Sequence, residues 1–211
     1  MKGSLNPNLC SFSNFNALVM ASEICFYRAS EKPYGPFSNL FKREILFEGE
    51  PFPTAEHAYQ AGKPRREAVR DWLMAAPSPA LLAMAAHGLY VWDVRSDWSK
   101  IKFARMHKVL LAKFTQHADL EKLLVSTGDK TLVETPRANT PVNRLWGRVD
   151  GKGKNMLGLL LMEVREELLQ TKYPSGKPKD SVCKSIHMVD HGGLHKLGVA
   201  MPLEPDTEIM K

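Results

Sequence analysis

Residues 53–63 read PTAEHAYQAGK, and this stretch predicts a helix that carries chemistry. Thr54 is a good N-cap, because its side-chain oxygen can accept a hydrogen bond from a backbone N–H in the first turn. No strong helix breaker follows before the end of the stretch. On such a helix Glu56, Gln60 and Lys63 are spaced i, i+4 and i+7, so that a carboxylate, an amide and an amine share one face.

Two interpretations of this polar face are open. A solvated helix face would show the same residue types, whereas a buried face would bring them together as a site. The same run also carries His57 and Tyr59, and Glu56 lies near the positive end of the helix dipole, which favours its charged form. Partial burial would raise the pKa of such a carboxyl towards a range that is useful for catalysis.

The sequence around this helix predicts a single helix-rich α+β domain with a few short strands. The strand-like stretches are 24–27, 44–47 and 131–134, with a turn at 48–50. Further helices are predicted to begin at Pro64, after Ser78, after Asp97, at Leu120 and at Met156.

The helix at 98–116 is the longest of these, and the first helix after residue 63 is expected to bury Trp72 together with Leu73. The apolar stripe of the long helix begins at Trp98 and ends at Phe114. Its four lysines lie largely off this stripe: Lys100, Lys102, Lys108 and Lys113.

The length and net charge of the chain limit the kinds of protein it can be. The 211 residues have a formal net charge of +6, which fits an anionic ligand such as a nucleotide and equally a basic but inert surface. We expect an extension at 1–22, one domain at 23–171 and a tail at 172–211. No apolar run is long enough for a membrane helix, and we expect a cytoplasmic protein.

Neither a metal site nor a cofactor is predicted. The three cysteines include no CxxC pair, which disfavours a structural zinc site or a disulfide framework. His187, His191 and His195 follow helical spacing in the tail, but two glycines interrupt that pattern and no carboxylate completes a ligand set.

Two further stretches offer binding groups. Residues 34–40, YGPFSNL, predict a tight turn that presents Ser38 and Asn39. Residues 146–158, WGRVDGKGKNMLG, place glycines and lysines just before a helix N-terminus, where backbone N–H groups can hold an anion. Trp146 is either a flat surface for a base or a core residue.

Together these stretches resemble one family, called YbiA-like or NADAR after its link to NAD and ADP-ribose. The resemblance covers about residues 25–170. It is carried by the ordered stretches 26–27, 34–40, 53–61, 95–98, 112–114, 123–128, 132–134, 146–147, 151–158 and 161–165.

The resemblance implies an N-glycosidase that hydrolyses the bond between a ribose C1 and a nitrogen. Members of the family release ribose 5-phosphate from riboflavin-pathway intermediates or remove ADP-ribose from guanine in nucleic acid. The essential glutamate of the family aligns with Glu56. The sequence departs from the family at Asn143, where an Asp usually precedes the Trp-Gly pair by three residues.

A mechanism follows as a hypothesis from these residues. Glu56 stabilises an oxocarbenium-like centre or activates water, and Lys63 either attacks C1 to give a Schiff base or binds phosphate. The expected substrate-binding residues are Ser38, Asn39, His57, Gln60, Arg95, Arg105, Asn143, Trp146, Gly147, Lys152, Lys154 and Asn155. The partner would be a nucleotide-like molecule or ADP-ribosylated nucleic acid. The alternatives are a non-catalytic NAD or ADP-ribose binding module and a small interaction protein.

Overall fold

The computed structural model describes residues 23–172, and these residues form seven α-helices, one short 3-10 helix and four strands. The predicted α+β class, rich in helices and with short strands, is confirmed. The expected extension, almost all of the expected tail and its three histidines lie outside the described residues. In chain order the elements are β1 (Glu23–Phe26), η1 (Gly35–Phe37), β2 (Ile45–Phe47), β3 (Glu50–Phe52), α2 (Ala55–Ala61), α3 (Glu67–Met74), α4 (Pro79–His87), α5 (Trp98–Gln116), α6 (Ala118–Val125), β4 (Thr131–Glu134), α7 (Pro141–Trp146) and α8 (Met156–Lys172).

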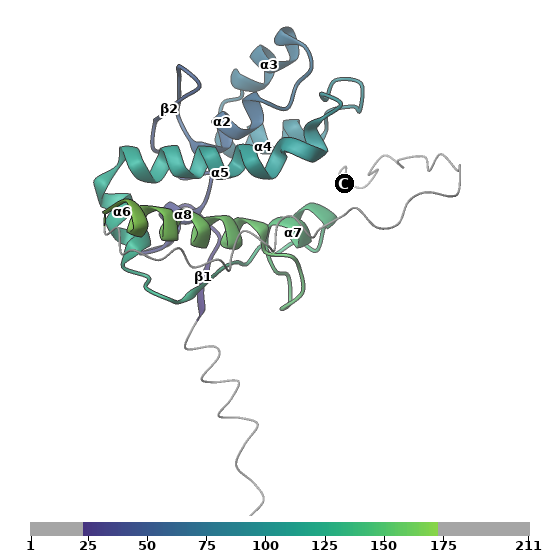
Figure 1. Cartoon of the computed structure of the whole chain (residues 1–211). Helices are drawn as coiled ribbons and strands as arrows, with labels where there is room; N and C mark the ends of the chain where they lie inside the picture. Colours follow the sequence, from purple (N-terminus) through teal and green to yellow (C-terminus); the bar gives the residue numbers. More distant parts are fainter. Residues whose placement is uncertain (1–22, 173–211) are drawn as a thin grey trace, which may run out of the picture. The chain divides into compact units, whose positions relative to one another are not determined.

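The two longest helices, α5 and α8, pack side by side and form the centre of the domain (Figure 1). The apolar stripe of α5 is buried at Met106, Val109, Leu110 and Phe114, as its spacing predicts. Helix α2 packs against α5 and α4, while β4 packs against α8. None of the helices among the described residues is long and apolar enough to cross a membrane.

The strands form two small sheets. Strand β1 pairs in parallel with β4, and this register sets Phe26 opposite Glu134. Strands β2 and β3 form an antiparallel hairpin in which Ile45 pairs with Phe52. The sequence analysis did not predict β3, because a strand of three residues that contains a proline carries almost no pattern of its own.

The start of α3 differs from the prediction. Pro64 does not open this helix, which begins at Glu67, because Pro64 lies extended and bridges to Val94. Burial on α3 also differs: Leu73 is fully buried, but Trp72 is 61% exposed. Helix α7 was not predicted either, although Thr140 caps it with its side chain.

The prediction for Lys113 is wrong, because this lysine is fully buried in α5. Its ammonium donates hydrogen bonds to the carbonyl oxygens of Pro36 (2.5 Å) and Ser38 (3.0 Å), and it lies over the ring of Phe41. Lys113 comes three residues after Leu110 and four after Val109, so helical spacing places it on the apolar stripe itself. The loop at residues 34–41 supplies the carbonyl oxygens that its buried amine requires.

Candidate functional site

Helix α2 brings the polar residues of the predicted site into the interior. Thr54 caps the helix as predicted: its Oγ1 accepts the His57 backbone N–H (3.3 Å) and lies 2.7 Å from His57 Nδ1. Glu56 is 8% exposed and Gln60 is 3% exposed. These low exposed fractions exclude a solvated helix face. The His57 side chain contacts the capping residue Thr54.

Glu56 is a buried carboxyl with two favourable neighbours. Gln60 Nε2 donates a 2.8 Å hydrogen bond to Glu56 Oε1. Burial raises the pKa of the Glu56 carboxyl, while the Gln60 hydrogen bond and the positive charge of Lys63 oppose that rise. Because both neighbours favour the ionised form, Glu56 can hold a negative charge inside the protein.

A second carboxyl, Glu134, faces the same site at the end of β4. Burial raises the pKa of Glu134 to about 7, and the charge of Glu56 adds to the rise. The backbone of Glu134 is fixed on both sides: its N–H donates to Asn155 Oδ1 (3.0 Å) and its carbonyl accepts from the Arg148 N–H (2.8 Å). No positive charge opposes the rise in the pKa of Glu134, whereas Lys63 opposes the corresponding rise at Glu56.

The sequence analysis did not propose Glu134 as a site residue. In the sequence it is only the last residue of a short strand, 78 positions after Glu56 by numbering. Its place within the family-like stretch 132–134 was a weak signal. Its proximity to Glu56 arises from the tertiary structure, because the two residues lie on elements distant in the chain.

Three lysines follow one another from Glu56: Lys63 lies beside this carboxyl, Lys102 lies near Lys63, and Lys154 lies near Lys102. Lys63 is half-buried and donates a hydrogen bond to the Ala86 carbonyl oxygen. Burial lowers the pKa of Lys63, Glu56 opposes this, and the charge of Lys102 adds to it. Burial also lowers the pKa of Lys102, and the charge of Lys154 lowers it further. Lys102 is missing from the predicted site residues because it was expected to lie off the apolar stripe of α5. It comes four residues before Met106, so it lies on that stripe and is half-buried.

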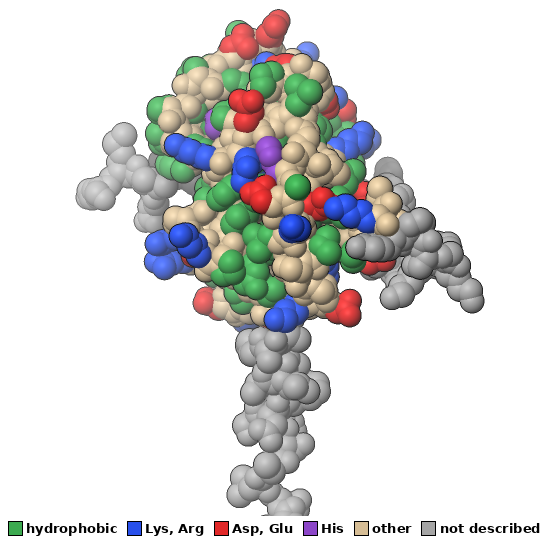
Figure 2. All heavy atoms as spheres, turned by 90° about the vertical axis from the view of Figure 1, so that its left-hand side faces the viewer, with side chains coloured by type: hydrophobic (Ala, Val, Ile, Leu, Met, Phe, Trp, Pro, Cys, Tyr) green, Lys and Arg blue, Asp and Glu red, His purple; other side chains and the backbone are tan. Residues whose placement is uncertain are grey.

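Within residues 23–172 most lysines have no carboxylate partner, since Lys172 is the one lysine there that forms an ion pair. None of Lys63, Lys102 and Lys154 forms an ion pair with a carboxylate among the described residues. By contrast, Lys172 pairs with Glu121 on α6, and Figure 2 shows basic and acidic side chains interspersed on the face to which α6 contributes. Lysines gathered without counter-charges are suited to a polyanion such as a phosphate.

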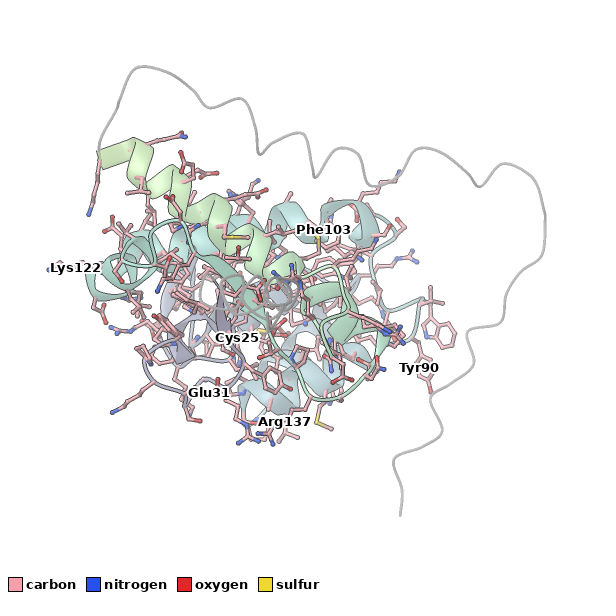
Figure 3. All side chains as sticks on the ribbon, turned by 90° about the horizontal axis from the view of Figure 1, so that it is seen from below. Cys25, Glu31, Tyr90, Phe103, Lys122 and Arg137 are labelled. Atoms are coloured by element: carbon pink, nitrogen blue, oxygen red, sulfur yellow. The ribbon has the colours of Figure 1, made fainter. Side chains whose placement is uncertain are left out.

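Aromatic rings form one wall next to Glu56. Tyr59, on α2, contacts Trp98 (ring centroids 5.0 Å apart) and the edge of Trp146 (5.6 Å). Trp146 is half-buried and also contacts Phe103, 5.5 Å away, which is labelled in Figure 3. Trp146 therefore lies at the site, where a partly open ring can stack on a base.

The glycine that follows Trp146 allows a close approach of two backbone segments. A Cβ atom at Gly147 would lie only 2.6 Å from the carbonyl oxygen of Glu134. Asn155 supports the same junction, since its amide bonds to both the N–H of Glu134 and the carbonyl of Leu132 (2.8 Å). Gly147 and Asn155 thus position the end of β4, and the Asn155 amide is already fully engaged there.

Three other predicted binding residues have their side chains engaged elsewhere. Arg95 pairs with Asp97 through two hydrogen bonds. Arg105 donates to Glu48 and to two carbonyl oxygens of α2, and so supports the C-terminal end of that helix. The amide of Asn143 donates to the Ala138 carbonyl (2.7 Å).

The loop at Ser38 and Asn39 packs directly on the start of α2, since the Glu56 N–H donates to the Asn39 carbonyl (3.0 Å). Ser38 Oγ accepts the N–H of Leu40 (3.3 Å). Lys152 is exposed in the turn before α8, and its backbone pairs with Val149.

A surface cavity of about 990 Å³ adjoins the site on the side of Lys63. The Arg95 N–H donates to the Lys63 carbonyl (3.1 Å), which joins the cavity wall to the segment that follows α2. The cavity is lined by Pro64, Arg65, Val91, Trp92, Val94, Arg95, Ser96 and Asp97. Next to it Tyr90 stacks on Trp92, with centroids 4.6 Å apart, and Figure 3 shows Tyr90 at the edge of the domain.

Within residues 23–172, no group of three or more His, Cys, Asp and Glu side chains is arranged to hold a metal ion.

The chain is similar to known proteins of one family. The NADAR domain family matches residues 25–169. The N-glycosidase YbiA of Shigella flexneri is 39% identical over 151 residues, which cover 71% of this chain and 91% of that protein. A riboflavin biosynthesis protein of Vibrio vulnificus is 32% identical over 151 residues, covering 71% of this chain and 40% of its own length. The NMR structure of Escherichia coli YbiA has a TM-score of 0.65 and 38% identity, covering 75% of this chain and 91% of that one.

Proposed function

The chain belongs to the NADAR family and is a hydrolase of N-glycosyl bonds, and we propose that Glu56 and Glu134 are the carboxyl groups that perform the hydrolysis. The observation that carries this proposal is a pair of neighbouring carboxyls, Glu56 buried at the start of α2 and Glu134 half-buried at the end of β4. A non-catalytic binding module is not favoured, because relatives of the chain are N-glycosidases.

The two carboxyls have different tasks. Cleavage of an N-glycosyl bond develops positive charge at the sugar C1 and negative charge on the departing nitrogen. Glu56 in its ionised form, which Lys63 and the Gln60 hydrogen bond favour against the effect of burial, stabilises the positive centre. Glu134, which retains its proton to about pH 7, donates that proton to the leaving nitrogen.

Lys63 is proposed as the nucleophile. Its amine attacks C1, the bond from C1 to the base nitrogen breaks, and the sugar ring opens to a Schiff base with a free 4-hydroxyl. Water then hydrolyses the Schiff base, which releases the free sugar and restores the amine. Burial supports this role, because it lowers the pKa of Lys63 and so increases the unprotonated fraction.

The proposed substrate is a phosphorylated N-riboside. Lys102 and Lys154, with Lys152 nearby in the chain, would hold its phosphate, and Trp146 would stack on its base. The test is parallel incubation of the full chain with an ADP-ribosylated guanine oligonucleotide and with a phosphoribosyl-amine intermediate of riboflavin synthesis, with released sugar read by mass spectrometry. Release of sugar from neither substrate would contradict the proposal.

The acid role of Glu134 predicts a pH dependence. Because the protonated form is the active one, kcat/KM is expected to fall as the pH rises through about 7. Glu134→Gln cannot donate a proton, so this variant should be less active below pH 7 and should lack that falling limb. A pH profile of kcat/KM for both proteins checks this, and an unchanged limb in the variant would remove Glu134 from proton transfer.

The Schiff base predicts a covalent adduct. Borohydride added during turnover of the phosphoribosyl-amine substrate should reduce the imine and attach the sugar to Lys63. Peptide mass spectrometry locates the adduct, and Lys108→Ala, which changes an exposed lysine on α5, should leave it in place. If active enzyme yields no adduct at Lys63, this residue acts through its charge alone.

A further inference from the structure

Two buried amide oxygens beside Glu56 have no hydrogen-bond partner. They are Asn39 Oδ1 and Gln60 Oε1, and among the buried side-chain oxygen and nitrogen atoms of residues 23–172 they alone lack one. Asn39 is 8% exposed and Gln60 is 3% exposed. A buried acceptor without a donor is costly and rare in a native protein, so each of these atoms points to a ligand that donates.

The orientation of each amide follows from its other contact. Gln60 Nε2 donates to Glu56 Oε1 at 2.8 Å, and a carboxylate oxygen can only accept, so the Gln60 oxygen must face the other way. Asn39 Nδ2 contacts Met106 Sδ at 3.3 Å, and sulfur is a weak acceptor, which leaves Asn39 Oδ1 free.

Both acceptors lie around the same carboxyl. The Asn39 carbonyl accepts the backbone N–H of Glu56 at 3.0 Å, so Asn39 lies against the first turn of α2. Gln60 lies one turn further along and touches the Glu56 side chain itself. One acceptor thus belongs to a side chain bonded to the Glu56 carboxyl, and the other to a residue whose backbone is bonded to that of Glu56.

We propose that Asn39 Oδ1 and Gln60 Oε1 accept hydrogen bonds from the 2-hydroxyl and 3-hydroxyl groups of the substrate sugar, and so make the enzyme specific for ribose over 2-deoxyribose. This rests on the proposed function, which places the sugar C1 at Glu56. The hydroxyls on C2 and C3 are the donors nearest to C1, whereas the phosphate oxygens of the substrate are acceptors. A 2-deoxy sugar leaves one amide oxygen buried and unpaired, and sites of this kind reject such analogues strongly.

The test compares binding of ribose 5-phosphate with that of 2-deoxyribose 5-phosphate to the full chain by calorimetry. We expect ribose 5-phosphate to bind at least about 10-fold more tightly, corresponding to a hydrogen bond that a buried acceptor loses. Gln60→Met and Asn39→Leu keep side-chain volume and remove the acceptor. Each variant should weaken binding of ribose 5-phosphate, which carries both hydroxyls. The variant that loses the acceptor for the 2-hydroxyl should also reduce the preference for ribose 5-phosphate over 2-deoxyribose 5-phosphate.

The control variant removes a similar glutamine-to-glutamate hydrogen bond on another helix, α8. Gln170 donates to Glu166 (3.1 Å) one turn apart on the exposed face of α8, so Gln170→Met breaks an equivalent hydrogen bond. This variant should keep the full preference for ribose. Equal binding of the two sugars by the unmodified chain, which needs no variant to fold, would overturn the inference, and so would an unchanged preference in both site variants.

The outcome also separates this inference from the proposed function. Preference for ribose without release of sugar from any N-riboside would support the hydroxyl contacts and contradict the hydrolytic roles. Hydrolysis of ribosyl and 2-deoxyribosyl substrates at equal rates would support the hydrolytic roles and contradict the hydroxyl contacts.

Discussion

Glu56→Gln is expected to reduce turnover of a phosphoribosyl-amine substrate by about 100-fold or more. The substitution keeps the shape of the side chain and removes its charge, so the positive centre at C1 loses its stabilising carboxylate. Binding of ribose 5-phosphate should change far less, because the lysines and amides that would hold the sugar phosphate remain. Steady-state kcat and the calorimetric affinity for ribose 5-phosphate measure the two effects separately.

Glu166→Gln is the matched control for this variant. Glu166 accepts a hydrogen bond from Gln170 one turn later on α8, as Glu56 does from Gln60, but on an exposed face. Turnover by Glu166→Gln should equal that of the unmodified chain. If Glu56→Gln retains full turnover, Glu56 has no part in the chemical step.

Lys113→Ala is expected to lower the free energy of unfolding by about 3 kcal/mol at pH 9. The variant removes a buried side chain and leaves the carbonyl oxygens of Pro36 and Ser38 without their donor. Relief from burying the amine offsets part of this loss. Because these carbonyls belong to the loop that carries Asn39, the variant should also weaken binding of ribose 5-phosphate. Urea unfolding measures the loss, and Lys108→Ala, on the exposed side of α5, should cost little.

The loss of stability in Lys113→Ala is expected to increase with pH. Burial lowers the pKa of Lys113 from its ordinary value of 10.5 to about 7. Between these values the unfolded chain holds a proton that the folded chain has released, so the contribution of Lys113 to stability rises with pH. The difference in unfolding free energy between the unmodified chain and Lys113→Ala should grow by up to about 1.4 kcal/mol per pH unit across this range. A difference that shrinks as the pH rises would contradict the burial of this amine.

The features of the site that the sequence predicted depend on interactions between residues close together in the chain. The cap at Thr54, the helix that follows it and the shared face of Glu56, Gln60 and Lys63 all depend on residues within about two helical turns. The sequence also resembled the NADAR family closely enough to predict N-glycoside hydrolysis. Whether that helix face was solvated or buried could not be decided from its own residues.

The amino-acid sequence by itself determined the long helices, the cap of α2 and the glutamate at its start, because spacing and capping are properties of neighbouring residues. Only the tertiary structure decided that Glu134 faces Glu56, that Lys102 and Lys154 approach each other, and that Lys113 is buried. The physical reason is that burial and the charges that shift a pKa come from segments distant in the chain, which the pairing of β1 with β4 and the packing of α5 against α8 bring together.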